Sequence, residues 1–177
     1  MEEEMQADNV KEQENNETGE TTGEESQTEE ETVILNKILK GETMAVDIYD
    51  QYSEQLEDQN MNNLLQQFKQ DHQNHAEMIS ERIKNLGAEP QTNTGMTGLI
   101  SKTMMEIGDL LGGRSSDQDI LKKVYEGEDM GINQVEENLQ TKLSSENQEL
   151  ITNILETDKQ HLEQLKGFFP EDSEPEE

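Results

Sequence analysis

The sequence contains no cysteine and no tryptophan, and its only aromatic residues are three phenylalanines and three tyrosines. The absence of cysteine excludes disulfides, thiolate metal ligands and thiol catalysis, so any metal ion must bind to oxygen and nitrogen atoms. No segment approaches the ~20 apolar residues that a membrane-spanning helix needs. The chain also opens with acidic residues rather than the basic region of a secretory signal. We therefore expect a cytoplasmic protein that does not enter a membrane.

Basic residues are scarce, with 13 lysines and arginines against 42 acidic residues and a formal net charge of −29. A surface of this charge repels nucleic acid, and most of it is expected to keep the protein soluble. Residues 1–31 hold thirteen of the acids with a single lysine, which favours a disordered acidic tail. We predict this tail, a folded domain at 32–170, and a second acidic tail at 171–177.

Four segments show the periodicity of amphipathic helices, and no segment has the pattern of a strand. The segments are residues 35–56, 61–86, 117–139 and 145–165. The predicted helix starts are Thr32 as an N-cap, Ser116-Asp117, and a Ser145-x-x-Gln148 capping box. The predicted stops are Gly87 with Pro90, and Gly167 with Pro170.

The connection between the second and third segments spans about thirty residues, whereas the other two connections are short. It contains a small amphipathic stretch, Leu99 to Leu111, flanked by glycines. A crossover of this length lets the second and third helices lie parallel, which is the connectivity of ferritin-like bundles. We therefore predict an all-α ferritin-like four-helix bundle whose long crossover carries a short extra helix. The alternative is a mobile loop that carries a nascent helix.

The chain contains an internal repeat, because residues 35–79 align without a gap on residues 121–165 after a shift of 86 residues. Glu42 then corresponds to Glu128, and His75 corresponds to His161. Any two amphipathic helical hairpins align in part, because the same common helix residues occur in both. That similarity does not explain well why rare residues such as histidine also coincide. We expect each half of the chain to supply one acid and one imidazole at matched heights.

Six ionisable residues fall in the apolar stripes of these helices: Glu42, His72, His75, Glu128, Asp158 and His161. Burying three carboxylates without partners costs several kcal/mol each, and no lysine or arginine lies on the same stripes. Two divalent cations would supply the missing charge, and imidazole with carboxylate suits iron, manganese or zinc. The alternatives are protonated acids bonded to the histidines, or a bundle rotated so that these groups face solvent.

A known family shares this pattern. The residues that carry the resemblance are Glu42, His75, Glu128 and Asp158-x-x-His161. Residues 33–168 resemble the ferritin-like superfamily, which includes bacterioferritins and rubrerythrins, and more narrowly the small bacterial ferritin-like proteins of unknown function. The resemblance implies a carboxylate-bridged dinuclear iron or manganese centre with Glu42 and Glu128 as terminal ligands. It also implies ferrous oxidation or peroxide detoxification, and Tyr49 matches an aromatic position beside such centres.

One departure from the family pattern bears on the chemistry. Superfamily members with a working site carry Glu-x-x-His on both ligand helices, whereas here His72 and Asp158 stand in place of the two glutamates. A single-metal site, an asymmetric site or zinc binding then becomes credible. Asp71 is a candidate substitute for the missing carboxylate, although it lies about 100° around the helix from the expected position.

A second hypothesis is a non-catalytic helical bundle with a degenerate site, acting as a structural, stress-related or partner-binding protein. Metal ions are the expected small partners, and the candidate assembly is a homodimer.

Overall fold

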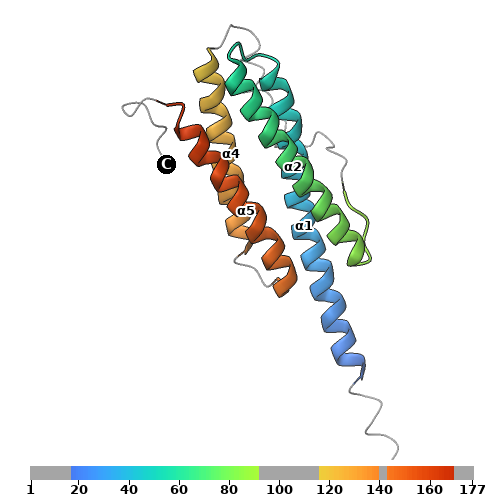
Figure 1. The fold of residues 1–177 in the computed structure, drawn as a ribbon. Coiled ribbons are helices and arrows are strands. Elements are labelled where there is room, and N and C mark those ends of the chain that lie inside the picture. Colours follow the sequence, from blue (N-terminus) through green and yellow to red (C-terminus); the bar gives the residue numbers. More distant parts are fainter. Residues whose placement is uncertain (1–16, 92–115, 140–142, 170–177) are drawn as a thin grey trace, which may run out of the picture.

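The computed structural model describes residues 17–91, 116–139 and 143–169, and these form four helices without a strand (Figure 1). The helices are α1 (Glu17–Ser53), α2 (Gln59–Asn85), α4 (Asp117–Leu139) and α5 (Ser145–Lys166). They form a bundle in which α1 packs on α2 and α4 packs on α5. The predicted all-α four-helix architecture is confirmed, while the amphipathic stretch 99–111 lies outside the described residues.

Helices α2 and α4 run in the same direction, and α5 runs in the opposite direction (Figure 1). Two contacts fix these directions. The carboxylate of Asp117, at the start of α4, accepts a hydrogen bond from the backbone N–H of Asp58, just before α2. At the other end of α2, the Arg82 side chain donates to Asn147 in the first turn of α5. The parallel arrangement expected from the long connection is therefore confirmed.

The core consists of two apolar clusters. One contains Ile34, Leu35, Ile38, Leu39, Ile79, Ile83, Ile132, Leu143, Ile151, Ile154 and Leu155. The other contains Tyr49, Tyr52, Leu65, Phe68, Ile120, Leu121, Val124, Tyr125 and Leu165. On every helix, the ionisable residues singled out above fall between a stretch of the first cluster and a stretch of the second. The bundle therefore has a polar layer enclosed between two apolar ones.

Helix α1 begins at Glu17, well before Thr32, so the predicted N-cap at Thr32 is wrong. The preceding segment, residues 17–31, has no proline and is rich in glutamate. Glutamate favours helix, and its charge is stabilising towards a helix N-terminus. The predicted division of the chain into tails and domain stays a prediction, since residues 1–16 and 170–177 lie outside the described part.

The other helix ends follow local rules. Asp58 caps α2 through its carboxylate, which accepts from the backbone N–H of Asn60 at 2.7 Å. Ser116 and Asp119 form a reciprocal capping box at the start of α4, with Ser116 N–H donating to Asp119 and Asp119 N–H donating to the Ser116 hydroxyl. Gly87 ends the α2 turn with a φ of 79°, which glycine adopts without strain. The predicted stop at Gly87 is confirmed.

Two carboxylates cap helices in trans. Glu31 of α1 is only 3% exposed and accepts hydrogen bonds from the backbone N–H of Ser144, before α5, and from Asn147 Nδ2. Asp117 of α4 accepts from the N–H of Asp58, before α2, at 2.7 Å. Glu31 with Asp117, and Asp58 with Ser144, are each separated by the 86 residues of the repeat. The first helix of each repeat therefore caps the second helix of the other.

This exchange overturns the capping box predicted at Ser145-x-x-Gln148. The N-cap of α5 is Ser144, and its side chain makes no capping hydrogen bond. Its hydroxyl donates instead to Glu31 Oε2, at 3.2 Å. A cap supplied by another helix cannot be recognised from local spacing.

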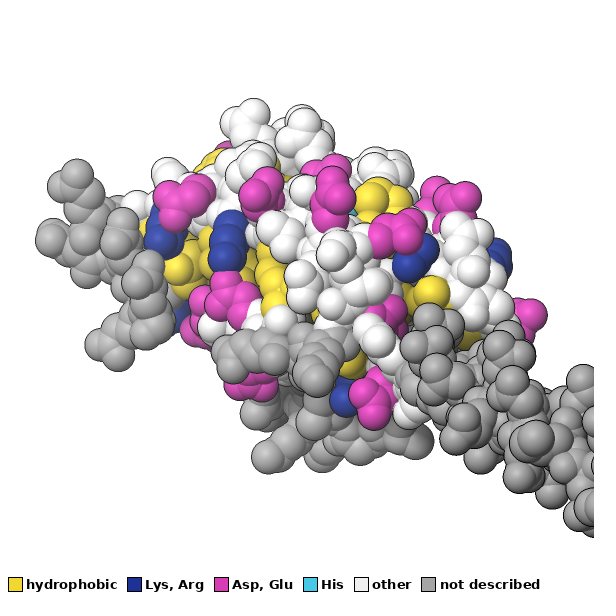
Figure 2. Space-filling model, turned by 90° about the horizontal axis from the view of Figure 1, so that it is seen from below, with side chains coloured by type: hydrophobic (Ala, Val, Ile, Leu, Met, Phe, Trp, Pro, Cys, Tyr) yellow, Lys and Arg dark blue, Asp and Glu magenta, His cyan; other side chains and the backbone are white. Residues whose placement is uncertain are grey.

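The surface reflects the composition, and acidic side chains are spread over the face shown in Figure 2 between apolar and uncharged groups. On this surface Arg82 forms an ion pair with Glu146 at 2.8 Å. None of the described helices combines the length and the apolar character needed to span a bilayer.

Replacing Glu31 with alanine should lower the free energy of unfolding by about 2 kcal/mol, because it removes the acceptor of the part-buried backbone N–H of Ser144 and of the buried side-chain amide of Asn147. The neighbouring Glu30→Ala change, at an exposed position of the same helix, is the matched control and should shift stability by less than about 0.5 kcal/mol. Urea unfolding followed by circular dichroism measures both. Equal effects of the two substitutions would contradict a capping role for Glu31.

Candidate metal centre

The six residues predicted as ligands lie together in the polar layer, and all four helices contribute. Each is at most 7% exposed, and the set comprises Glu42 of α1, His72 and His75 of α2, Glu128 of α4, and Asp158 and His161 of α5. The alternative in which these side chains face solvent is therefore wrong. Whether they ligate a metal stays a prediction.

The residues form two groups with the spacing of metal ligands. Glu42, His72 and His75 make the first group, whose candidate ligand atoms all lie within 4.8 Å of one another. Glu42 Oε2 lies 2.6 Å from His72 Nδ1 and 3.3 Å from His75 Nδ1. One carboxylate oxygen thus faces two imidazoles.

The second group contains His72, Glu128, Asp158 and His161, again within 4.8 Å of one another. Glu128 Oε1 lies 2.7 Å from His161 Nδ1. Its other oxygen, Oε2, accepts a hydrogen bond of 2.6 Å from the Tyr49 hydroxyl. The tyrosine therefore fixes the orientation of a candidate ligand, a role that its sequence position beside the centre did not specify.

His72 belongs to both groups, because its ring nitrogens face different carboxylates. Nδ1 is close to Glu42, whereas Nε2 lies 3.4 Å from Glu128 Oε2. Among the described residues, the only buried side-chain polar atoms without a hydrogen-bond partner are His72 Nε2 and Asp158 Oδ1. A buried polar atom that lacks a partner is costly. Two such atoms in one ligand group fit a site that holds a cation.

The electrostatics of the layer favour unequal protonation. Burial raises the pKa of Glu128, but contacts with His161 and His72 outweigh it and lower the pKa to about 2. The pKa of Glu42 is also lowered, because its contacts with His72 and His75 outweigh its burial. The same carboxylates raise the pKa of His72 well above its usual value despite burial. Two glutamates are therefore ionised around a protonated imidazole.

Asp158 behaves differently. Burial, followed by repulsion from Glu42 and Glu128, raises the pKa of its carboxyl group to about 8. Near neutral pH this group holds its proton. Asp158 is thus the one carboxyl group of the three with a raised pKa, but it makes no hydrogen bond to a histidine through Oδ1, so the alternative of protonated acids hydrogen-bonded to the histidines stays a prediction.

Asp71, the candidate substitute for the missing carboxylate, lies outside the two ligand groups. Its Oδ2 lies 3.2 Å from His161 Nε2, on the opposite side of that ring from Glu128. A carboxylate in this position accepts a hydrogen bond from Nε2–H of the imidazole. The proton then stays on Nε2, and Nδ1 is left free to bind a metal. The Phe68 ring stacks on His161 with centroids 3.9 Å apart and limits its rotation. The repeat gives no signal for Asp71, since the corresponding residue is Thr157.

The internal repeat is preserved in the geometry. Glu42 contacts His75 through Nδ1 as Glu128 contacts His161 through Nδ1, and these pairs correspond after the 86-residue shift. The third pair of equivalent positions holds His72 and Asp158, where the two halves differ. Both unpartnered atoms belong to this pair.

The family described as "Domain of unknown function (DUF2383)" matches residues 30–142. The chain belongs to this family. The match covers α1 from residue 30 onwards, all of α2 and α4, and four of the six candidate ligands, whereas Asp158 and His161 lie beyond it. The DUF2383 description assigns no activity. No curated protein matches the sequence.

Two solved structures share the fold. A two-domain protein from Anabaena variabilis, with DJ-1/ThiJ/PfpI-like and ferritin-like domains, superposes with a TM-score of 0.63 at 14% identity over 85% of this chain. The chain spans 41% of that protein. The conserved hypothetical protein Rv2844 from Mycobacterium tuberculosis gives 0.61 at 13% identity, over 78% of this chain and 96% of its own. The ferritin-like fold inferred from the sequence is confirmed, and at these identities the likeness concerns the fold alone.

The raised pKa of Asp158 predicts a pH-dependent stability for metal-free protein. The folded state keeps the proton up to about pH 8, whereas the unfolded chain releases it near 3.8, so unfolding becomes easier as pH rises between these values. Asp158→Asn removes this penalty. Its stability relative to wild type should increase by several kcal/mol from pH 5 to pH 9, at about 1.4 kcal/mol per pKa unit.

Chelator-treated protein, unfolded by urea at each pH, provides the measurement. The exposed Asp47→Asn variant is the control, and its curve should run parallel to that of wild type. Parallel curves for Asp158→Asn as well would mean that the buried carboxyl group ionises without penalty.

Proposed function

We propose that the protein binds divalent transition-metal ions, iron or manganese in the first place, in the polar layer of its ferritin-like bundle. The candidate ligands are Glu42, His72, His75, Glu128, Asp158 and His161. The observation that carries the proposal is the enclosure of four candidate ligands within 4.8 Å of one another. Two of their atoms, His72 Nε2 and Asp158 Oδ1, make no hydrogen bond and have only longer contacts, 3.4 Å to Glu128 Oε2 and 3.5 Å to His75 Nδ1. Imidazole nitrogen and carboxylate oxygen are the ligands that iron, manganese and zinc accept.

Charge supports the same proposal. Glu42 and Glu128 have lowered pKa values and are ready to bind a cation as carboxylates. Asp158 keeps a proton because two negative charges lie close by. A divalent cation would displace that proton and the proton on His72, so metal binding should release protons.

Bound iron or manganese would supply a redox couple and an open coordination position, which ferrous oxidation or peroxide consumption requires. The chain's own residues prepare the site for such chemistry. Tyr49 holds Glu128 in one orientation through a 2.6 Å hydrogen bond, and its ring stacks on His72 with centroids 5.2 Å apart. Burial raises the pKa of the Tyr49 hydroxyl well above its usual value, so the hydroxyl stays a donor.

A second candidate is a non-catalytic bundle with a degenerate site. The observation in its favour is that several polar atoms of the layer already satisfy one another, as in the contacts of Glu42 with His72 and of Glu128 with His161. Buried polar networks of this kind can serve structural specificity without a metal.

Metal analysis separates the two. Untagged protein loaded with ferrous iron or manganese should retain about one metal ion for each of the two ligand groups. A Glu42→Gln, Glu128→Gln double variant should lose most of this metal, because each change removes a charge and preserves volume. The matched control is Glu77→Gln, Glu163→Gln, which removes two exposed acids that also correspond in the repeat. Metal content is measured by elemental analysis after desalting.

Thermal unfolding adds a test that does not depend on the variants folding. Metal at about a thousand times its dissociation constant stabilises by ~4 kcal/mol, which corresponds to a rise in Tm of about 10 °C for a chain of this size. Retention of metal by the double variant, or an unchanged Tm of wild type with metal, would contradict binding in the polar layer.

Catalysis is tested by the rate of ferrous oxidation. If the centre is redox-active, ferric absorbance in air should appear at least tenfold faster with wild-type protein than with the Glu42→Gln, Glu128→Gln variant. The Glu77→Gln, Glu163→Gln control should match wild type. Bound metal combined with oxidation at the buffer rate would favour the non-catalytic candidate.

A further inference from the structure

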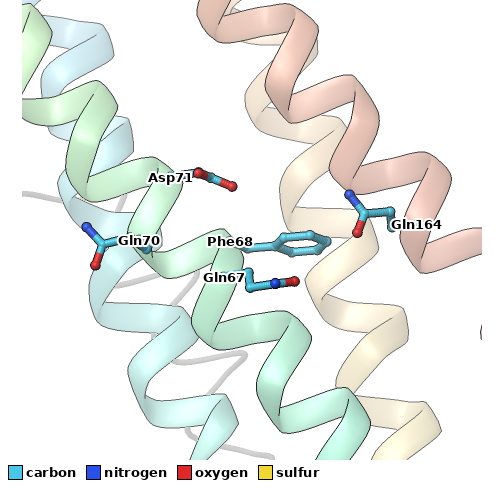
Figure 3. A pocket seen from close by; sticks show the side chains of 5 residues that line it. All are labelled: Gln67, Phe68, Gln70, Asp71 and Gln164. Atoms are coloured by element: carbon cyan, nitrogen blue, oxygen red, sulfur yellow. The ribbon is translucent and has the colours of Figure 1, made fainter.

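A surface depression of about 330 Å³ lies between α2 and α5, beside the polar layer (Figure 3). It is lined by Gln67, Phe68, Gln70, Asp71 and Gln164. Four of these five side chains are polar and three carry amide oxygens. Figure 3 shows Asp71 and Gln164 on facing helices across this space.

Asp71 connects the depression with the candidate metal centre. Its side chain is 42% exposed, while its Oδ2 lies 3.2 Å from Nε2 of His161, whose side chain is 2% exposed. The other candidate ligands are also enclosed, with side-chain exposures between 5% and 8%. One carboxylate thus contacts both solvent and a buried imidazole of the second ligand group.

Phe68 also connects the depression with the candidate metal centre. Phe68 lines the space and stacks directly on His161, with centroids 3.9 Å apart. A single layer of side chains therefore separates the depression from the second ligand group.

A hydrated cation needs oxygen ligands that can replace its water molecules one at a time before it enters a buried site. Asp71 supplies a carboxylate, and Gln67, Gln70 and Gln164 supply amide oxygens, the ligand types that such an ion accepts. The net charge of −29 raises the local concentration of cations over the whole surface. The depression is a place where these cations can approach the candidate metal centre.

We infer that this depression is the route by which divalent cations enter and leave the polar layer, with Asp71 as a transient ligand that passes the ion to the His161 side of the centre. The inference rests on the proposed function, since a route requires a buried site. Under this inference, Asp71 binds the ion during loading and release and is not a ligand of the bound ion at equilibrium.

The first test varies charge at Gln164, an exposed residue outside the proposed ligand set. Cobalt(II) is mixed with metal-free full-length protein, and its visible absorbance is followed by stopped flow. Gln164→Lys should slow loading about tenfold and Gln164→Glu should accelerate it, because electrostatic steering changes association rates by factors of this size. Both differences should shrink as salt is raised.

The control for this series is Gln148→Lys, which places the same charge at an exposed position of α5, about 24 Å away along the helix. It should load at the wild-type rate. Equal rates for Gln164→Lys and Gln148→Lys would overturn the route, even if both proteins bind the wild-type amount of cobalt.

The second test distinguishes a transient ligand from a residue that only positions His161. In Asp71→Asn the amide oxygen still accepts a hydrogen bond from His161 Nε2–H, but the charge is lost. We expect loading and release of cobalt to slow by a similar factor, about tenfold, so that affinity changes little. Asp47→Asn, the same change on an exposed site of α1, should leave both rates at their wild-type values.

A loss of affinity with an unchanged loading rate would mean that Asp71 only positions His161, and the inference would fail. Normal stoichiometry with loading rates indifferent to all these changes would also reject the route while the proposed function stands. Absence of stoichiometric cobalt in wild type would reject both together.

Discussion

The burial of three carboxyl groups against three imidazoles, in a layer between two apolar clusters, is the constraint on which the bundle depends. Ionised Glu42 and Glu128 are tolerated inside the protein because His72 contacts both. The compensation is incomplete, and Asp158 responds by keeping its proton with a pKa of about 8. Removing water from charged groups costs several kcal/mol for each ion. The apolar clusters on either side offset this cost, and they also hold four helices at the spacing that lets the six side chains meet.

Much of this arrangement could be predicted from the sequence. Helical periodicity placed Glu42, His75, Glu128 and His161 on inner faces, and the 86-residue repeat placed them at matched heights. The long connection between the second and third helices predicted which of them lie parallel. These features depend on spacing along one helix or on the length of a connection, and both can be read without knowing the neighbours.

The remaining features depend on contacts between helices. Glu31 looks like one acid among many in a charged segment, yet it is buried because α5 begins beside it. Tyr49 was expected near the centre, but its bond to Glu128 follows from how α1 and α4 pack. The repeat itself shows where the halves differ. Its equivalent pairs agree at Glu42 with Glu128 and at His75 with His161, whereas His72 stands opposite Asp158, so the two ligand groups are chemically distinct.

The exchange of helix caps between the two halves bears on how the chain folds. Glu31 and Ser144 are 113 residues apart, and Asp117 and Asp58 are 59 apart, so each cap joins one hairpin to the other. If the second hairpin folded alone, the N–H of Ser144 would lack the Glu31 acceptor; the first hairpin would keep the Asp58 cap of α2 but lose the bond from the Asp58 N–H to Asp117. Closing such long loops is entropically costly and is compensated only when both hairpins dock. Half-folded forms are therefore disfavoured, and the two halves of the repeat, although similar in sequence, behave as one cooperative unit rather than as two small domains.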